Sequence, residues 1–320
     1  REVFLKKNLT AESFAVELGP NDGILLEHFA SRGIRHLGIE PAGGVAAVAE
    51  SRGISIVRDF FSESLATKIA GQHGLADVIM AANVMCHIPS IQDVAKGIAK
   101  LLKPDGVLVF EDPYLGDVMR LCSYDQIYDE HVFLFSALSV SAIFEPFGLH
   151  LVDVSHQTTH GGSMRYTLAK SGAVEHSKEV ENLIAQEYGL GLHLTRTYLD
   201  FAKRVAVSGE MLRSTLERLA KEGRSIAAYG ATSKSTTIYN YAQIGPNLIS
   251  AVFDNTPNKI GKYTPGVHIP VVDEKQFSVD PPSVTFLSAW NHESEILERH
   301  HRYTDLGGRW LSHVPTVRFL

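Results

Sequence analysis

The stretch FAVELGPNDGILLEHF, residues 14–29, predicts the fold of the first half of the chain. Residues 14–18 are an apolar run typical of a buried strand. Residues 19–23 follow as a tight turn, because glycine adopts backbone conformations that other residues avoid. Residues 24–29 then begin a helix. A strand, a glycine turn and a helix in this order indicate the opening unit of a doubly wound α/β fold.

The same alternation continues along the chain. Short turns separate the elements, so we expect a parallel sheet with helices on both faces. The predicted strands cover residues 35–40, 54–57, 76–80 and 106–110, and a helix covers 93–102. Residues 149–168 predict an antiparallel pair of strands that turns at 159–162.

The second half predicts a further α/β unit. Residues 173–222 have amphipathic spacing and predict one or two long helices. Strands are expected over 225–230, 248–254 and 283–287, with an edge strand at 309–311. We therefore predict a Rossmann-like domain over residues 1–172, linking helices over 173–222 and a smaller Rossmann-like domain over 223–320.

Composition excludes several classes of protein. The chain has 320 residues with 44% hydrophobic and 21% charged residues, as in ordinary globular proteins. Its net charge of -6 does not indicate nucleic-acid binding. No apolar run approaches the roughly 18 residues of a membrane span. Cys86 and Cys122 suggest neither disulfides nor a zinc site, and the 15 histidines lack ligand spacing. We expect a cytoplasmic protein without metal, a monomer or weak homo-oligomer.

The first glycine turn predicts a nucleoside cofactor. Its glycines permit close backbone approach to a ligand, but Asn21 replaces the middle glycine of the NAD fingerprint. Glu40, at the next strand end, is expected to accept both ribose hydroxyls. Asp59 is expected at the adenine amino group and Phe60 against the ring. This order suits S-adenosylmethionine better than NAD. The expected cofactor-binding set is Glu17, Gly19, Asn21, Asp22, Gly23, Glu40, Asp59, Phe60 and Asn83. The alternative is a glycine turn that closes an ordinary α/β unit.

Residues 107–136 carry an unusual density of acids and aromatics. An apolar strand passes into a segment where carboxylates alternate with tyrosines and end at His131. Such groups beyond a strand's carboxyl end are typical of an α/β active site. From the residues alone, a surface or interdomain ion pair between Glu130 and His131 remains open. Asp117, Asp125 and Asp129 are expected to be caps or surface groups.

Residues 230–235, GATSKS, predict a phosphate site in the second α/β unit. Free N–H groups and the dipole at a helix start favour an anion. The expected substrate-binding set is His160, Gly161, Arg165, Tyr229, Gly230, Thr232, Ser233, Lys234, Asp254, Trp290 and Asn291. Within it, Asp254 is expected to contact a sugar hydroxyl of a nucleotide. The alternative is that Gly230 is only a turn and Lys234 is solvated, and for Trp290 and Asn291 both binding and packing remain open.

Several segments resemble a known enzyme family. Residues 17–23 resemble motif I of class I methyltransferases. The segments NVMCHIP (83–89), FEDPYLG (110–116), YDQIYDEH (124–131), THGG (159–162), YGATSKS (229–235) and AWNH (289–292) resemble sugar C-methyltransferases of deoxysugar biosynthesis. The resemblance covers essentially the whole chain. It implies a class I methyltransferase domain that uses S-adenosylmethionine, and a nucleotide-linked, usually dTDP-linked, 4-keto-deoxysugar methylated at C3, as in antibiotic biosynthesis.

The resemblance also implies catalytic roles. His131 would be the base at C3, Glu130 would orient it, and Tyr128 would hydrogen-bond the developing enolate. His87 would be a second polar group facing the sugar, with a capping role as its alternative. Family members usually carry an N-terminal domain with a cysteine-bound structural zinc, and no segment here corresponds to it. Two other functions remain as alternatives, an NAD-dependent nucleotide-sugar oxidoreductase and a non-catalytic nucleotide-sugar-binding protein.

Overall fold

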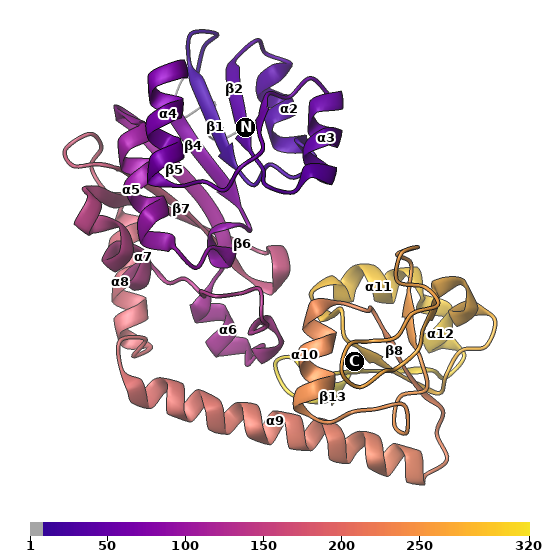
Figure 1. Ribbon diagram of the computed structural model, residues 1–320. Coiled ribbons are helices and arrows are strands. Elements are labelled where there is room, and N and C mark those ends of the chain that lie inside the picture. The colour runs from indigo at the N-terminus through magenta and orange to yellow at the C-terminus, as the bar shows by residue number, and fades with distance from the viewer. Residues whose placement is uncertain (1–8) are drawn as a thin grey trace. The chain divides into compact units, whose positions relative to one another are not determined.

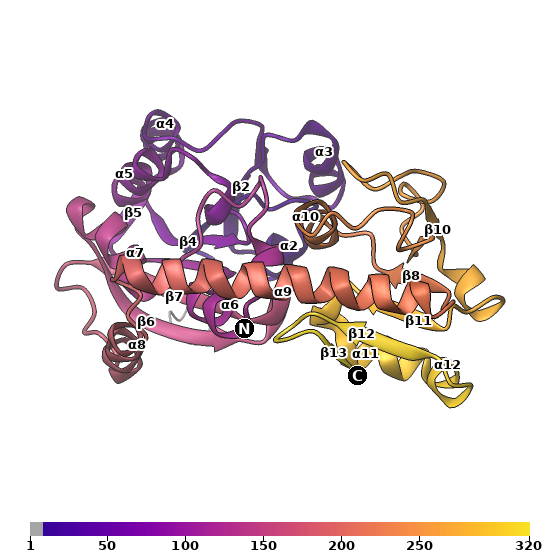
Figure 2. The same cartoon turned by 90° about the horizontal axis from the view of Figure 1, so that it is seen from below.

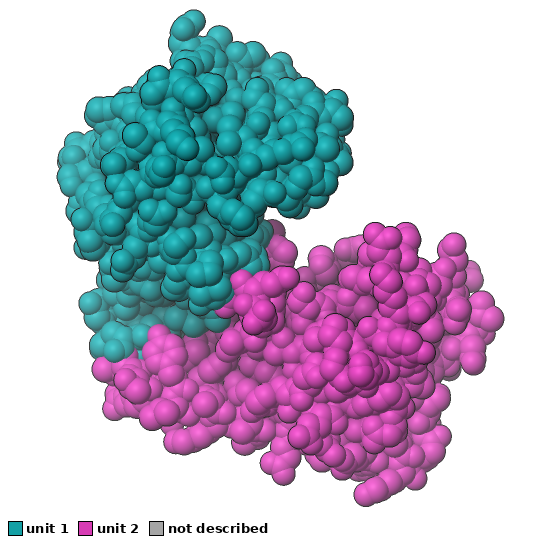
Figure 3. Space-filling view, in the orientation of Figure 1, with its two compact units in different colours: residues 1–115, 132–158, 162–193 teal, residues 116–131, 159–161, 194–320 magenta. Residues whose placement is uncertain are grey.

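The structure is a computed structural model that describes residues 9–320 (Figure 1). Contacts divide the chain into two compact units, which Figure 3 colours separately. Unit 1 comprises residues 1–115, 132–158 and 162–193, and unit 2 comprises 116–131, 159–161 and 194–320. Residues 116–131 and 159–161 therefore group with unit 2, whereas the sequence assigned them to the first domain. None of the helices in residues 9–320 is long and apolar enough to cross a membrane.

Unit 1 is built on a seven-stranded sheet in the order β3-β2-β1-β4-β5-β7-β6. Its strands are β1 (Phe14–Leu18), β2 (Arg35–Ile39), β3 (Ile56–Val57), β4 (Ala76–Ala82), β5 (Leu102–Pro113), β6 (Leu149–Gln157) and β7 (Ser163–Lys170). The strands β1 to β5 run parallel, and β7 and β6 complete the sheet in antiparallel pairing. The strand order reverses between β1 and β4, and ligands bind beyond the carboxyl ends of strands at such a switch point.

Helices cover both faces of this sheet (Figure 1). They are α2 (Ile24–Ala30), α3 (Gly43–Ser51), α4 (Glu63–His73), α5 (Ile91–Leu101), α7 (Ala137–Phe144) and α8 (Lys178–Gly189). One core contains Leu65, Ile98 and Phe144, from α4, α5 and α7. A second core contains Phe29 and Ala49, from α2 and α3. Burial on both faces explains why the strands are continuously apolar rather than alternating.

The strand β5 extends further than the sequence indicated. The prediction ended at residue 110, but β5 continues to Pro113 because β7 pairs with its far end. Glu111 lies opposite Arg165, and Asp112 lies opposite Met164. The two acids therefore belong to the sheet rather than to the loop that follows. Conversely, β3 has only two residues, Ile56–Val57.

Unit 2 contains a six-stranded sheet in the order β10-β9-β8-β11-β12-β13. Its strands are β8 (Ile226–Tyr229), β9 (Val252–Asp254), β10 (Val271–Asp273), β11 (Val284–Leu287), β12 (Arg309–Ser312) and β13 (Arg318–Phe319). The prediction that β12 is an edge strand was wrong, because β13 pairs with it in antiparallel orientation. Both β10 and β13 are too short to produce a detectable sequence pattern.

The helices of unit 2 begin with α6 (Leu115–Leu121), which the chain enters directly after β5. The others are α9 (Thr195–Lys221), α10 (Ser233–Tyr241), α11 (Glu293–Arg299) and α12 (His301–Asp305). The predicted amphipathic region forms two helices, α8 and α9, and Figure 2 shows α9 as one continuous helix. Its buried stripe includes Val205, Leu212 and Leu216, as the helical spacing predicts.

Candidate active site

The cofactor-binding residues that the sequence predicts lie at or just beyond the carboxyl ends of β1, β2, β3 and β4. Leu18 pairs with Ile39 and with Ala81, so these three strands end at a similar level. The glycine turn after β1, the acid after β2 and the polar residue after β4 therefore share one edge of the unit 1 sheet.

The glycine turn after β1 requires glycine at two places. Gly19 has φ +63, and a Cβ there would lie 2.6 Å from Cγ2 of Val84. Gly23 has φ +83 and begins α2. Asn21, between them, also has a positive φ of 53. Asparagine tolerates this conformation better than most residues, so the turn keeps its shape without a third glycine.

Glu40 is buried at the end of β2 and ties the turn to its own strand. Its Oε2 accepts the N–H of Asn21 at 3.1 Å, and its Oε1 accepts the N–H of Ala42 at 2.9 Å. Each carboxylate oxygen retains a second lone pair. The side chain is therefore fixed by the backbone and still able to accept two hydroxyl groups, as expected for a ribose.

Glu17 is a buried acid near the end of β1 with one unsatisfied oxygen among the described residues. It is 3% exposed, and its Oε2 has no hydrogen-bond partner among residues 9–320. Burial raises the pKa of Glu17 to about 8. A buried polar atom left unsatisfied is costly unless a ligand completes it. A carboxyl group in this place fits a cofactor that brings a cationic or N–H donor group, as S-adenosylmethionine does.

Asp59 and Phe60 lie in an exposed position after β3. Oδ1 of Asp59 accepts the N–H of Phe60 at 2.8 Å. The Phe60 side chain is 76% exposed, which is unusual for a large apolar ring. An exposed ring at the cofactor edge of the sheet is consistent with the predicted stacking on adenine.

Asp22 and Asn83 hold their segments by local contacts. Oδ2 of Asp22 accepts a hydrogen bond from Nη1 of Arg52 at 2.9 Å, so its carboxylate is engaged within the protein. Asn83 has φ +53, and its N–H donates to the carbonyl of Glu111 at 2.7 Å. That bond ties the chain after β4 to the end of β5.

His87 ends η1 (Met85–His87), the short helix after β4, and its side chain is half-buried. Asp112 is completely buried near the end of β5. Burial raises the pKa of Asp112 to about 7, although the thiol of Cys86 and the backbone N–H groups of Met85 and Cys86 favour its charged form. The sequence analysis missed Asp112, although it lies inside the FEDPYLG segment.

The structure brings His131 and Tyr128 together in unit 2. Nδ1 of His131 lies 2.8 Å from the backbone carbonyl oxygen of Gln126. A carbonyl only accepts, so Nδ1 carries the proton, and Nε2 of the neutral ring is then the basic nitrogen. The Tyr128 and His131 rings have centroids 3.9 Å apart at 32°. Glu130 is exposed.

Two of the three acids that were expected to be caps or surface groups are buried instead. Asp125 is completely buried, and its Oδ2 accepts the indole N–H of Trp290 at 2.6 Å. The expectation for Asp125 was therefore wrong, and the contact shows Trp290 packed within unit 2. Asp117 is also buried, and its Oδ1 accepts a hydrogen bond from Arg120 at 2.8 Å. Asp129 is exposed, as predicted.

Asp254 in unit 2 repeats the arrangement of Glu40 in unit 1. Its Oδ2 accepts the N–H of Ala231 in the turn after β8, at 2.8 Å. Its Oδ1 accepts the N–H of Thr256, two residues further on, at 2.8 Å. Gly230 in this turn has φ +97, and a Cβ there would lie 2.7 Å from Cβ of Ala289. Both units therefore have a glycine turn fixed by a buried acid at the end of the next strand.

The residues after this turn begin α10. Oγ1 of Thr232 accepts the N–H of Ser235 at 3.0 Å, so its hydroxyl caps the helix. Ser233 is exposed at the first position of α10. Lys234 is 8% exposed, so the alternative of a solvated side chain was wrong. Its Nζ donates to the carbonyl of His160 at 3.2 Å, and burial lowers its pKa.

Two predicted substrate-binding side chains are engaged elsewhere. The hydroxyl of Tyr229 lies 3.0 Å from Nε2 of His300, and the ring belongs to the core of unit 2. Arg165 lies in unit 1, where Nη2 and Nε bind Oε2 of Glu111 at 2.9 and 3.1 Å. Arg165 therefore belongs to unit 1, whereas His160 and Gly161 group with unit 2. Asn291 is half-buried in η6 (Trp290–His292).

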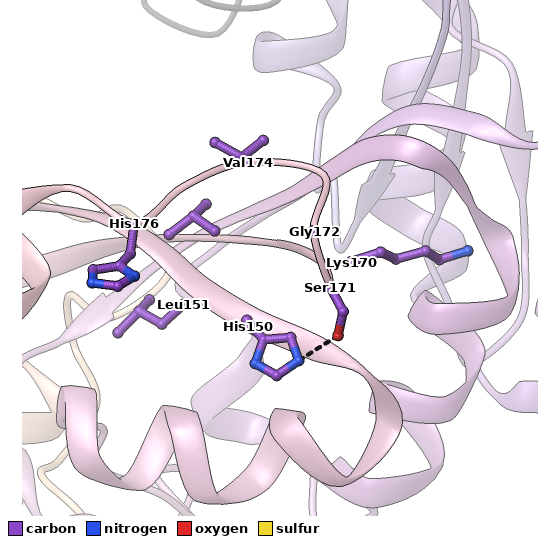
Figure 4. Close-up of a pocket in the computed structure, with 8 residues that line it drawn as sticks. His150, Leu151, Lys170, Ser171, Gly172, Val174 and His176 are labelled. Carbon is purple, nitrogen blue, oxygen red and sulfur yellow. Dashed lines mark hydrogen bonds between the residues drawn. The ribbon is translucent and has the colours of Figure 1, made fainter.

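A pocket of about 240 Å³ lies elsewhere in unit 1 (Figure 4). Its lining includes His150, Lys170, Ser171 and His176. His150 and Lys170 lie in the half of the β6–β7 pair that adjoins Val107, whereas Pro113 at the carboxyl end of β5 pairs with Ser163. The pocket therefore lies at the sheet edge opposite the cofactor residues and is no part of the candidate site.

Comparisons with known protein families match both halves of the chain. Residues 4–154 match a family described as a methyltransferase domain. Residues 158–315 match one described as the C-methyltransferase C-terminal domain.

Individual proteins are similar as well. The chain is 33% identical over 314 residues to C-methyltransferase NovU of Streptomyces niveus, covering 98% of this chain and 74% of that protein. Among solved structures, N-methyltransferase NodS from Bradyrhizobium japonicum WM9 is 20% identical, with a TM-score of 0.40 over 53% of this chain and 93% of that one. A SAM-dependent methyltransferase from Anabaena variabilis ATCC 29413 is 13% identical, with a TM-score of 0.43 over 53% and 82%.

Proposed function

Since this chain belongs to the S-adenosylmethionine-dependent C-methyltransferases, we propose that it methylates C3 of a dTDP-linked 4-keto-deoxysugar. His131 is the base in this proposal. The observation that carries it is the bond between Nδ1 of His131 and the Gln126 carbonyl, because that bond leaves Nε2 basic. A positioned imidazole is a good base for a proton next to a ketone.

In the proposed reaction, a proton moves from C3 to His131 before the methyl group is transferred. Nε2 of His131 takes the proton from C3, and the electron pair of that C–H bond forms the enolate, with the charge on the C4 oxygen. Tyr128, beside the imidazole, donates a hydrogen bond to that oxygen. When bound, S-adenosylmethionine would supply a methyl group attached to a sulfonium. A new bond would form between C3 and the methyl carbon from the enolate's electron pair, and the bond between that carbon and sulfur would break. The products are the C3-methylated ketosugar and S-adenosylhomocysteine.

Unit 1 holds the cofactor in this proposal. Glu40 accepts the ribose hydroxyls, and Glu17 accepts a donor group of the cofactor with its unsatisfied Oε2. Phe60 stacks on the adenine. His87, which is half-buried after β4, faces the sugar as a second polar group.

Unit 2 holds the nucleotide part of the substrate. Support comes from the turn after β8, where Asp254 accepts the N–H of Ala231 as Glu40 accepts that of Asn21. The exposed Ser233 and the first N–H groups of α10 favour the diphosphate. Glu130, which is exposed next to the base in the chain, orients it in this proposal.

The test is a comparison of His131→Ala with Asp129→Ala, which removes an exposed acid two residues away. For each variant we would measure methyl transfer to a dTDP-4-keto-deoxysugar, deuterium exchange from solvent into C3, and S-adenosylmethionine binding by calorimetry. His131→Ala is expected to lose exchange and methyl transfer while it binds the cofactor, and Asp129→Ala to keep all three. Normal exchange into C3 in His131→Ala would contradict the proposal.

A further inference from the structure

Asp125 is a buried acid that the proposed mechanism does not use. Asp125 and His313 are both fully buried in unit 2, with Nε2 of His313 at 3.7 Å from Oδ1 of Asp125. The other oxygen, Oδ2, accepts the indole N–H of Trp290 at 2.6 Å. Burying a carboxylate is costly unless donors compensate it, and the indole N–H of Trp290 is such a donor.

The position of Asp125 in the chain suggests a role for it. It lies in η2 (Tyr124–Gln126), immediately before the residue whose carbonyl binds Nδ1 of His131. Gln126 is itself fully buried, and its N–H donates to the carbonyl of Ser123 at 3.1 Å. The hydrogen bond from Trp290 to Asp125 therefore holds the backbone next to the carbonyl that sets the tautomer of His131.

Trp290, the hydrogen-bond partner of Asp125, also lies beside the proposed nucleotide site. Lys234, in the first turn of α10, has its Nζ 5.3 Å from the centroid of the Trp290 ring. Gly161 is packed so closely on that ring that a Cβ would lie 2.1 Å from Cη2 of Trp290. The helix α10 also packs against η2. Trp290 thus contacts the start of α10 with its ring and Asp125 with its N–H.

We propose that Asp125 is a positioning residue for His131, and that its hydrogen bond to Trp290 ties the base to the nucleotide-binding start of α10. The catalytic part of this inference rests on the proposed function. The structural part does not, because it concerns only how the segment from Tyr124 to His131 is held. Removing the indole N–H releases that segment, so His131 loses its orientation while the cofactor residues of unit 1 are unchanged.

The experiment uses the full chain and four variants. Trp290→Phe keeps a ring but removes the N–H donor, and Asp125→Leu removes the acceptor. Asp125→Asn keeps an oxygen that accepts the indole N–H of Trp290, so this variant should behave as the wild type does. Trp310→Phe is the matched control, because this indole is also buried in unit 2, at 1% exposed, and its Nε1 has no partner among the described residues.

The first readout is hydrogen–deuterium exchange of the amides of Gln126, Ile127 and His131, which donate to carbonyls within this segment. Trp290→Phe and Asp125→Leu are expected to speed it roughly tenfold or more, the range for loss of a hydrogen bond to a charged group. Asp125→Asn and Trp310→Phe should exchange as the wild type does. Unchanged exchange in Trp290→Phe, or equal loosening in Trp310→Phe, would overturn the inference.

The second readout is kinetic. With a ketosugar that the wild type methylates, Trp290→Phe and Asp125→Leu should lower kcat roughly ten- to hundredfold. The KM for S-adenosylmethionine should stay unchanged. A loss of S-adenosylmethionine affinity instead of kcat would overturn the positioning role. If the wild type methylates no ketosugar, the proposed function fails, and the exchange experiment still decides whether Asp125 holds the His131 segment.

Discussion

Replacing Glu17 by glutamine should stabilise the protein and weaken the cofactor at the same time. Glu17 is 3% exposed and has a raised pKa of about 8 because burial penalises its charged form. Glutamine has nearly the same shape and carries no charge at any pH. The variant therefore removes an ionisation penalty from the free protein, and it also removes the carboxylate that the cofactor is proposed to use.

The size of the effect on stability follows from the shift in pKa. Between the ordinary value of 4.5 and about 8, the native carboxyl keeps a proton that the unfolded chain releases. The free energy of unfolding of the wild type therefore falls as pH rises through this window and levels off above it. At about 1.4 kcal/mol per pKa unit, the full loss is about 5 kcal/mol. Glu17→Gln lacks this loss.

The assay is urea unfolding of the wild type and Glu17→Gln at several pH values without cofactor. The variant should match the wild type near pH 4.5 and exceed it by about 4 kcal/mol near pH 8. Glu12→Gln is the control, because Glu12 is exposed and close in sequence. In calorimetry at pH 7, Glu17→Gln should bind S-adenosylmethionine roughly ten- to hundredfold more weakly. An equal pH dependence of unfolding, or unaltered cofactor affinity, would refute the reasoning.

Three further substitutions have definite expected results. Asp112→Asn should raise the free energy of unfolding at pH 8 but not at pH 4, because burial raises the pKa of Asp112 to about 7, and urea unfolding at both pH values checks this. Gly161→Ala should lower the melting temperature, since a Cβ meets Trp290 at 2.1 Å and φ is +84, whereas Gly172→Ala, at φ +74 with no neighbour within 4 Å, should lower it less. Asp254→Asn should weaken binding of the nucleotide dTDP in calorimetry and leave S-adenosylmethionine binding unchanged. The N–H groups of Ala231 and Thr256 each donate to a different oxygen of Asp254, and an amide has only one oxygen.

Local patterns predicted most of the fold. The strands of unit 1 and its antiparallel finish are confirmed, because apolar runs between short turns mark them. The predicted helical region is confirmed as α8 and α9, because its apolar residues have helical spacing. The resemblance to C-methyltransferases and the use of S-adenosylmethionine are also confirmed. The short strands β10 and β13 were not predicted, because two or three residues are too few to show an alternating pattern. The assignment of residues 116–131 to unit 2 depends on contacts distant in sequence, such as the Asp125–Trp290 bond across 165 positions.

The candidate site was less predictable than the fold. Strand ends indicated Glu17 and Glu40 as candidates, since the βα alternation places both near the carboxyl edge of the sheet. Asp112 and Asp125 were not identified, because a sequence does not distinguish a buried acid from an exposed one in a segment rich in both. The structure also engages Tyr229 and Arg165 in contacts with His300 and Glu111, which no local pattern indicates. The catalytic roles of His131, Tyr128, Glu130 and His87 stay predictions.

The most direct test of the central claim is to locate the transferred methyl group. A panel of dTDP-4-keto-deoxysugars would be incubated with S-adenosylmethionine labelled in its methyl group, and the products analysed by mass spectrometry and NMR. We expect one labelled methyl group on C3 of a ketosugar, with loss of the original C3 proton. A label on oxygen or nitrogen, or no transfer to any ketosugar of the panel, would contradict it.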